Sequence, residues 1–302
     1  MRVFARLLIA TSICLAATAT ARAEDEDDGG EESSAPNDDA LITEGGFDKE
    51  TWPLEVVNRP LTLAGGMAEI RGDSLRIGIS GGDAFDVGEP IVLAPEIYYG
   101  VSDKLTVGIT HTNHATFFPP AGFCLSGEEN GCPKPYNAIG AEAQYALTRG
   151  GNLNLAARAG ISTGRFSPDF ALGATAGLLI RFRGGKIALV VDPNLYIGII
   201  ERDTFPFGME DASYPDYLFM PAQLQYQLNT QAMVYLMSGL NTPLKDMGDF
   251  VQIPAGLGAS YALNNRMDAG LELQIANLAG KDIGPIGKFD ERYLIARIAI
   301  RL

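Results

Sequence analysis

The chain has few of the residues that build metal centres: its 302 residues include 3 Cys and 2 His. A metal site would need further Cys or His ligands, so we expect no metal and no cofactor. Basic residues are scarce as well, with 23 Lys and Arg against 37 Asp and Glu, a net charge of -14 at pH 7. Because nucleic-acid-binding proteins need a basic surface, we exclude nucleic acid as a partner.

Long apolar runs are also missing. After residue 23 no stretch is uniformly apolar over the ~18 residues that a transmembrane helix needs. Residues 1–23 combine a basic start, an apolar run of about a dozen residues and a final Ala-Arg-Ala, which is the pattern of a secretory signal peptide cleaved after Ala23. Cys14 lies inside this segment, and we expect it to be removed with the signal.

Alternation of apolar and polar residues is what the chain has in abundance. In residues 267–275, for example, Leu271 falls on an apolar face and Glu272 on the opposite, polar face. Strict period two over ~10 residues is typical of transmembrane β-strands, in which lipid-facing and lumen-facing side chains alternate. The same pattern recurs at 139–147, 153–162, 187–199, 218–228 and 294–302.

Short turns that closely follow an aromatic residue join five pairs of strands. Each aromatic shares parity with the apolar face of its own strand, and amphipathic aromatics favour the headgroup level of a bilayer. We predict that these residues form a girdle at the periplasmic interface, on the lipid side. Its members are Tyr99, Tyr145, Phe182, Tyr226 and Tyr261.

Counting strands gives the fold. Five turns imply ten strands, Leu294–Leu302 adds an eleventh, and Met67–Ser80 adds a twelfth if a bulge at Gly72 corrects its alternation. An even number of strands leaves no unpaired edge in lipid. We therefore predict an all-β fold, a transmembrane antiparallel up-and-down β-barrel of about 12 strands, with short turns on the periplasmic side and six long loops outside.

The organisation around the barrel follows from composition. Residues 24–48 are acidic and hold too few large apolar residues to bury a core, so we expect a disordered periplasmic segment. Residues 49–66 carry the only tryptophan and form an approach segment that could tuck against or into the mouth of the barrel, which spans residues 67–302. Cys124 and Cys132 lie in the longest outer loop of an exported chain, so we expect a disulfide between them.

The inward parity of the strands collects charged and amide side chains. So many charges would be very costly in the core of a soluble sandwich, whereas in a barrel they line water or pair across it. Small inward residues such as Gly173, Gly177 and Gly258 are expected to leave room for a pore. The predicted lumen-lining residues are Glu96, Glu142, Gln144, Arg158, Arg181, Asp192, Gln223, Gln225, Asp268, Glu272, Arg297 and Arg301.

Two interpretations of this lumen stay open. It is either a hydrophilic pore, weakly charge-selective because both signs are present, or a plugged lumen whose charges satisfy one another. A lipid hydrolase built on His111 is a third and weaker hypothesis. Nucleophilic catalysis would require a serine within hydrogen-bond reach of the ring, and no outward serine is evident on that strand. We therefore expect no enzymatic activity.

The signal segment, the aromatic-and-turn units and the terminal strand Tyr-Leu-Ile-Ala-Arg-Ile-Ala-Ile-Arg-Leu resemble those of Gram-negative bacterial outer-membrane β-barrel proteins, in particular porin-like ones. The resemblance covers the signal and everything from about Pro60 onward, although such proteins usually end in an aromatic residue and this chain ends in Leu302. No motif identifies a subfamily. The resemblance implies the bacterial outer membrane as the location, with membrane lipid and the barrel-insertion machinery as partners.

The function that we expect is a passive channel for small hydrophilic solutes. The alternative is a plugged structural or adhesive barrel whose outer loops bind a partner, and a distant third is an outer-membrane lipid-modifying enzyme. Pattern carries the fold rather than the function. The identity of the solute, the pore size, the choice between monomer and trimer, and the role of the acidic segment stay open.

Overall fold

The computed structural model describes residues 47, 50–81, 88, 90–111, 122–126, 136–165, 170–202, 216–245, 247, 251–280, 289 and 291–302. The expected signal peptide, nearly all of the acidic segment, and Cys132 lie outside the described residues. All of the described residues belong to the compact unit formed by residues 38–302. Within these ranges no helix is long and apolar enough to cross a membrane.

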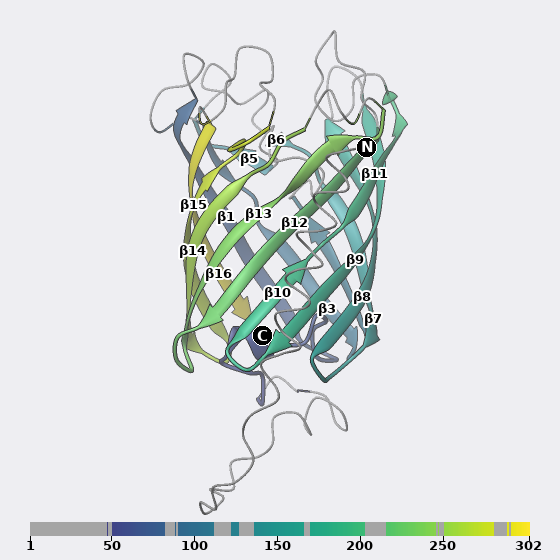
Figure 1. The fold of residues 1–302 in the computed structure, drawn as a ribbon. Coiled ribbons are helices and arrows are strands. Elements are labelled where there is room, and N and C mark those ends of the chain that lie inside the picture. The colour runs from purple at the N-terminus through teal and green to yellow at the C-terminus, as the bar shows by residue number, and fades with distance from the viewer. Residues whose placement is uncertain are drawn as a thin grey trace, which may run out of the picture. The chain divides into compact units, whose positions relative to one another are not determined.

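The chain forms a closed antiparallel β-barrel of twelve strands, as predicted, and Figure 1 shows the strands running obliquely around one interior. Neighbours in sequence pair with one another, and the last strand pairs with the first to close the ring. Nine strands are continuous: β1 (Ala68–Gly81), β4 (Leu105–Thr110), β8 (Leu153–Arg165), β9 (Ala171–Gly184), β12 (Asp216–Gln227), β13 (Ala232–Pro243), β14 (Ala255–Asn264), β15 (Met267–Ile275) and β16 (Glu291–Arg301). Each of the other three strands is interrupted and consists of two labelled segments. These are β2 (Ile91–Leu93) and β3 (Glu96–Ser102), β6 (Tyr136–Asn137) and β7 (Gly140–Thr148), and β10 (Ile187–Val191) and β11 (Asn194–Ile200). The short β5 (Gly122–Cys124) pairs with β2 and β6.

Proline lies in two of the three breaks. Pro95 separates β2 from β3, and Pro193 separates β10 from β11. A proline has no N–H to donate to the ladder, so pairing stops there and resumes beyond it. At the second break the carbonyl of Pro193 still accepts a hydrogen bond from the Leu178 N–H at 3.0 Å. The chain therefore crosses the break without leaving the wall.

The first strand has a bulge, slightly beyond the position predicted at Gly72. Its register against β16 shifts between Asp73 and Leu75. One extra residue in a strand moves every later side chain of that strand to the opposite face of the wall. Arg71, before the shift, and Arg76, beyond it, therefore both face inward, each stacked over a buried tyrosine.

Short and long connections lie at opposite ends of the barrel (Figure 1). The five short turns follow β3, β7, β9, β12 and β14 and lie at the same end as the C-terminus. We call this the turn end, and the opposite end the loop end. The six longer connections lie at the loop end, and many of their residues are outside the described ranges.

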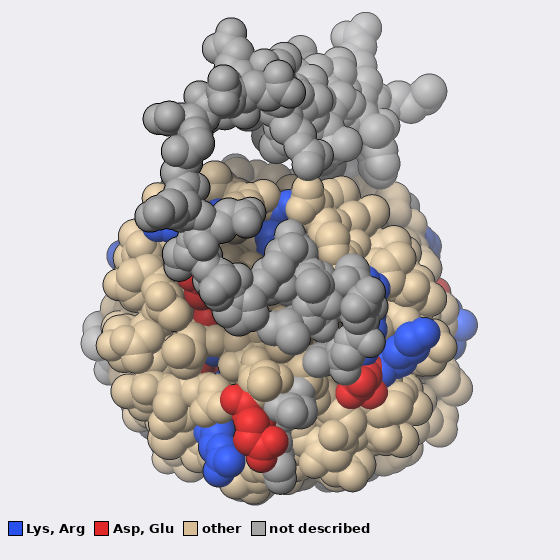
Figure 2. All heavy atoms as spheres, turned by 90° about the horizontal axis from the view of Figure 1, so that it is seen from below, with Lys and Arg blue, Asp and Glu red and all other residues tan. Residues whose placement is uncertain are grey.

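The outer wall is apolar. Leucines at outward positions are openly exposed, with accessible fractions of 58% for Leu257 and 52% for Leu271. Figure 2 shows a different face, the turn end, where a few Lys, Arg, Asp and Glu lie among uncharged residues. Soluble proteins rarely expose contiguous apolar surface on this scale, and a closed ring of strands leaves no unpaired edge. The barrel is therefore a transmembrane barrel whose outer partner is lipid.

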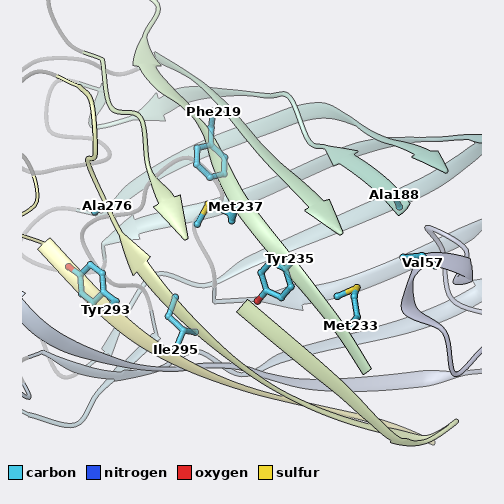
Figure 3. Packing of buried hydrophobic residues seen from close by; sticks show 9 residues of the cluster. All are labelled: Val57, Ala188, Phe219, Met233, Tyr235, Met237, Ala276, Tyr293 and Ile295. Carbon is cyan, nitrogen blue, oxygen red and sulfur yellow. The ribbon is translucent and has the colours of Figure 1, made fainter. Parts of the chain in front are cut away.

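The interior contains an apolar cluster as well as polar side chains. Its strand residues come from β10, β12, β13 and β16 but not from β14, so they pack across the interior rather than only along the wall. This packing reduces the open cross-section of the barrel. The members, shown in Figure 3, are Val57, Ala188, Phe219, Met233, Tyr235, Met237, Ala276, Tyr293 and Ile295.

Candidate functional site: the barrel lumen

The structure places the predicted lumen residues on the inner face of the wall. In a wall one sheet thick, a buried side chain can only point inward. Asp192, Gln223 and Arg297 are half-buried. The other nine are buried: Glu96, Glu142, Gln144, Arg158, Arg181, Gln225, Asp268, Glu272 and Arg301.

A first charge network connects β7, β8 and the break between β10 and β11. The Nε of Arg158 lies 3.7 Å from Glu142 Oε2, and its Nη1 contacts Asp192. Gln144 donates a further hydrogen bond to Glu142 at 2.7 Å. One arginine thus pairs with two carboxylates that come from different elements of the wall.

A second network lies at the seam where β1 meets β16. Arg301 on β16 lies 2.6 Å from Glu69 on β1 and also contacts Asp268 on β15. Asp268 accepts two hydrogen bonds from Arg59, at 2.6 and 2.8 Å. Because Arg59 precedes the first strand, this bidentate pair ties the N-terminal segment to the wall.

A third network joins Arg297, Glu272 and Tyr235. Arg297 Nη2 lies 3.0 Å from Glu272 Oε2, and the Tyr235 hydroxyl donates to the same oxygen at 2.7 Å. The Tyr235 oxygen in turn accepts from Arg297 Nη1 at 2.8 Å. Unlike the arginines of the other networks, Arg297 keeps 32% of its side chain accessible, close to the 33% of Arg71.

Small inward residues do not leave the open space that the sequence suggested. A Cβ at Gly258 would lie 2.2 Å from Tyr235 Cζ, and the two residues are directly opposite each other on β13 and β14. A missing side chain on one strand gives the large side chain of a neighbouring strand a place to lie. The expectation that these glycines widen a pore is therefore wrong. The glycines and the residues that cover them are Gly173 with Tyr196, Gly177 with Asn194, and Gly258 with Tyr235.

Residues 50–66 lie inside the barrel at the turn end, and we call them the plug. The 3₁₀ helix η2 (Val56–Asn58) places Val57 against the apolar cluster, as Figure 3 shows. Trp52 is buried in a second cluster, which also contains Leu63 of the plug and Tyr98 of β3. The segment expected to approach the mouth of the barrel thus fills part of its interior.

Hydrogen bonds hold the plug to separate sides of the wall. Arg59 binds Asp268 on β15, and its carbonyl accepts from Arg181 on β9. The strands β10, β12, β13 and β14 separate these two contacts along the sheet. Elsewhere on the ring, the Leu63 N–H donates to Thr106 on β4 at 2.8 Å. The plug therefore spans the turn end rather than following one strand.

Strand β3 is shaped to admit the plug. The Gly100 N–H donates to the Met67 carbonyl at 2.8 Å, and the Gly100 carbonyl accepts from Gly66 at 2.7 Å. A Cβ at Gly100 would lie 2.0 Å from the Ala64 oxygen. Only glycine allows another backbone to approach so closely.

A cavity of about 310 Å³ lies between the plug and the wall. The plug contributes Trp52 and Thr62 to its lining, and the wall contributes polar side chains from β1, β7, β12, β15 and β16. Ligand pockets of small molecules begin at about this size. The charged lining residues are Glu69, Arg71, Asp268, Arg297 and Arg301.

The five predicted girdle aromatics are exposed on the outer wall, each close to a short turn. Their accessible fractions lie between 40% for Phe182 and 49% for Tyr145. They come from five different strands near the turn end. That they mark the periplasmic interface stays a prediction.

His111 follows β4 at the loop end and has both ring nitrogens engaged. Its Nδ1 contacts the Pro95 carbonyl, an acceptor, so the ring proton is on Nδ1 and Nε2 accepts from the Tyr136 hydroxyl at 2.8 Å. A catalytic base needs a ring nitrogen facing its nucleophile. Among the described residues no serine bonds this ring, and the absence of an enzyme stays a prediction.

Of the two cysteines in the predicted disulfide, one lies among the described residues. Cys124 ends β5, beside Phe123, whose ring centroid lies 4.7 Å from that of Tyr136. Cys132 lies outside the described residues. The bond between them therefore stays a prediction.

Sequence reasoning missed the bulkiest side chains of the interior and the residues that meet the plug. Alternation could have identified two of the tyrosines. Tyr98 and Tyr293 are separated by an even number of positions from Glu96 and Arg297, which were predicted to face inward. Arg59 lies outside any strand and has no periodic signal. The residues absent from the predicted lumen set are Arg59, Glu69, Arg71, Tyr98, Tyr217, Tyr235 and Tyr293.

The closed ring of twelve strands, the apolar outer wall and the short turns at one end define a transmembrane β-barrel of the bacterial outer-membrane type. No family profile matches the chain, and no curated protein matches it either. Among solved structures, the NanC porin matches 78% of this chain and 100% of its own, with 9% identity and a TM-score of 0.51. This likeness establishes the fold.

Two further structures match with lower TM-scores. An outer-membrane channel from Pseudomonas putida F1 shares 14% identity over 80% of this chain and 97% of its own, with a TM-score of 0.46. Outer membrane phospholipase A from Escherichia coli shares 11% identity over 82% of this chain and 98% of its own, with a TM-score of 0.39.

Proposed function

We propose that this protein is a narrow channel for small hydrophilic solutes in the outer membrane of a Gram-negative bacterium, and that the plug closes its turn end. The observation that carries the proposal is the way in which the plug is held. It belongs to no strand of the barrel, and side-chain contacts such as Arg59 with Asp268 fix it to the wall. A segment held in this way can leave while every strand stays paired.

The remaining interior suits polar solutes. The cavity beside the plug is lined by arginines, carboxylates and the amides of Gln144, Gln223 and Gln225. Tyrosines that cover glycines and the apolar cluster narrow the rest of the lumen. Small solutes and a low conductance are therefore expected, with weak charge selectivity because both signs line the path.

The second candidate is a permanently plugged barrel with a structural or adhesive role. The contacts of the plug with β4, β9 and β15 favour this candidate, because they fix the segment on several sides. The two functions differ in one observable. A channel whose plug can leave passes current in steps, whereas a permanently closed barrel passes none.

Single-channel recording in a planar bilayer tests the proposal. The intact protein should show rare, small steps, and Arg59→Ala should lengthen the open time because the plug loses its bidentate anchor. Asp268 keeps Arg301 as a partner in this variant, so the wall itself is preserved. Arg202→Ala is the matched control, since Arg202 pairs with Asp216 away from the plug. Absence of steps in both the intact protein and Arg59→Ala would favour the plugged barrel.

A further inference from the structure

The cavity beside the plug has an excess of positive charge. Three arginines line it against two carboxylates. Two partners of these groups lie just outside the lining: Glu272 pairs with Arg297, and Arg59 pairs with Asp268. Including both gives four arginines and three carboxylates, an excess of one positive charge within these seven side chains. An anion is the ligand that would balance it.

Buried donors point to the same conclusion. Trp52 Nε1 and Arg301 Nη1 have no hydrogen-bond partner within the described part of the chain, although both side chains are at least 95% buried. The guanidinium of Arg301 lies 5.7 Å from the Trp52 ring centroid, so the two donors occupy one region of the cavity. Buried polar groups are normally satisfied, which makes this region a place for an acceptor.

We infer that the cavity binds a small hydroxycarboxylate. Its carboxylate would take hydrogen bonds from Arg297 and Arg301, with Trp52 as a further donor at that end. Its hydroxyl groups would donate to Gln225 Oε1, an acceptor that has no donor among the described residues. This inference rests on the proposed function for the entry of the solute, but binding itself is measured without transport.

The single tryptophan of the chain makes the site directly observable. Trp52 lines the cavity, so its fluorescence, excited where tyrosine does not absorb, reports the site alone. Titration of the full-length protein in detergent micelles with sodium gluconate should give a saturable change in Trp52 emission. Sorbitol, which has the same carbon chain and hydroxyl groups but no carboxylate, should give none at the same concentrations. An equal response to both compounds overturns the inference.

Two substitutions should shift the affinity for gluconate in opposite directions. Arg297→Gln removes a cation and should weaken binding by about tenfold, as expected for one charge-assisted bond. Glu272→Gln removes the carboxylate that competes for Arg297 and should tighten binding several-fold, while the amide oxygen can still accept from Tyr235. Arg202→Gln, away from the cavity, should leave the affinity unchanged. A purely structural role would weaken binding in both Arg297→Gln and Glu272→Gln, and that result overturns the inference.

Two further measurements distinguish a loss of gluconate binding from misfolding of the barrel and from a loss of transport. A folded barrel resists unfolding by heat, and its migration on a gel before and after heating shows whether each variant is folded. If Arg297→Gln does not fold, Arg71→Gln is tested in its place. Saturable gluconate binding without conductance steps would refute the channel and leave the site intact. Conductance steps without selective gluconate binding would refute the site and leave the channel intact.

Discussion

The outer and inner faces of the barrel wall obey different rules. Outward side chains meet one uniform environment, so any apolar residue serves, and Leu257 and Leu271 have no special partner. Inward side chains meet specific groups of nearby strands, as Glu272 on β15 meets Arg297 on β16 and Tyr235 on β13. One apolar residue can replace another on the outer face, whereas a substitution on the inner face also affects the residues that contact it. The predictions below test this difference.

The largest effect is expected on the outer face. Leu271→Arg should lower the free energy of unfolding by roughly 2–4 kcal/mol, because a charge near the bilayer midplane faces hydrocarbon. Denaturant unfolding in lipid vesicles measures the loss. Gln223→Arg, on the inner face of β12, is the control and should cost much less. Similar losses from both would show that the two faces are not distinct.

A smaller loss is expected from crowding the inner face. Gly258→Ala should cost about 1–3 kcal/mol, because the new methyl group would overlap the Tyr235 ring. In a Tyr235→Leu background the same change should cost less, since the ring is gone. Gly184→Ala is the control, because nothing lies within 4 Å of a Cβ there. An equal cost at Gly258 and Gly184 would remove the case for this packing.

Displacing the plug should affect the barrel less than either change. Gly100→Ala would bring a methyl group against the Ala64 carbonyl, so the plug should move away from β3. Trp52 emission should shift to the red as the ring meets water, and the plug should become easier to cleave with protease. Unchanged emission and protection would show that the plug tolerates a side chain at this position.

The smallest effect on the barrel is expected from the loop cysteines. In the chain-entropy account, a bond between Cys124 and Cys132 orders its short loop by roughly 2–3 kcal/mol and leaves the strands untouched. Double replacement by serine should therefore keep the heat resistance of the barrel and make the outer loop more sensitive to protease. Alkylation of both thiols in the native, non-reduced protein would disprove the bond.

Parity explains why the fold could be predicted from the sequence. Lipid imposes one requirement on every outward position, so alternation such as that of Leu271 and Glu272 recurs along the chain and allows the strands to be counted. The bulge near Asp73 was expected for the same reason, although its position was missed. Local breaks of pairing at Pro95 and Pro193 depend on single residues and left the overall count unaffected.

The lumen could be predicted only in part, because parity gives the side of the wall and not the neighbours. Glu142 and Arg158 were expected inside, but their pairing through adjacent strands required the register. Gly258 was interpreted as open space because the sequence does not show that Tyr235 lies opposite. Arg59 could not be predicted at all, since nothing periodic marks a segment that enters the barrel from its end.

The seam between β1 and β16 joins the two ends of the chain. Arg301 comes from the last strand, Glu69 from the first, and Asp268 from the strand before the last, so their shared contact exists only after the two ends of the chain have met. Arg59 binds the same Asp268 from a segment that precedes every strand. Asp268 is therefore shared between the closure of the barrel and the docking of the plug, so a single carboxylate links the beginning of the chain to its end.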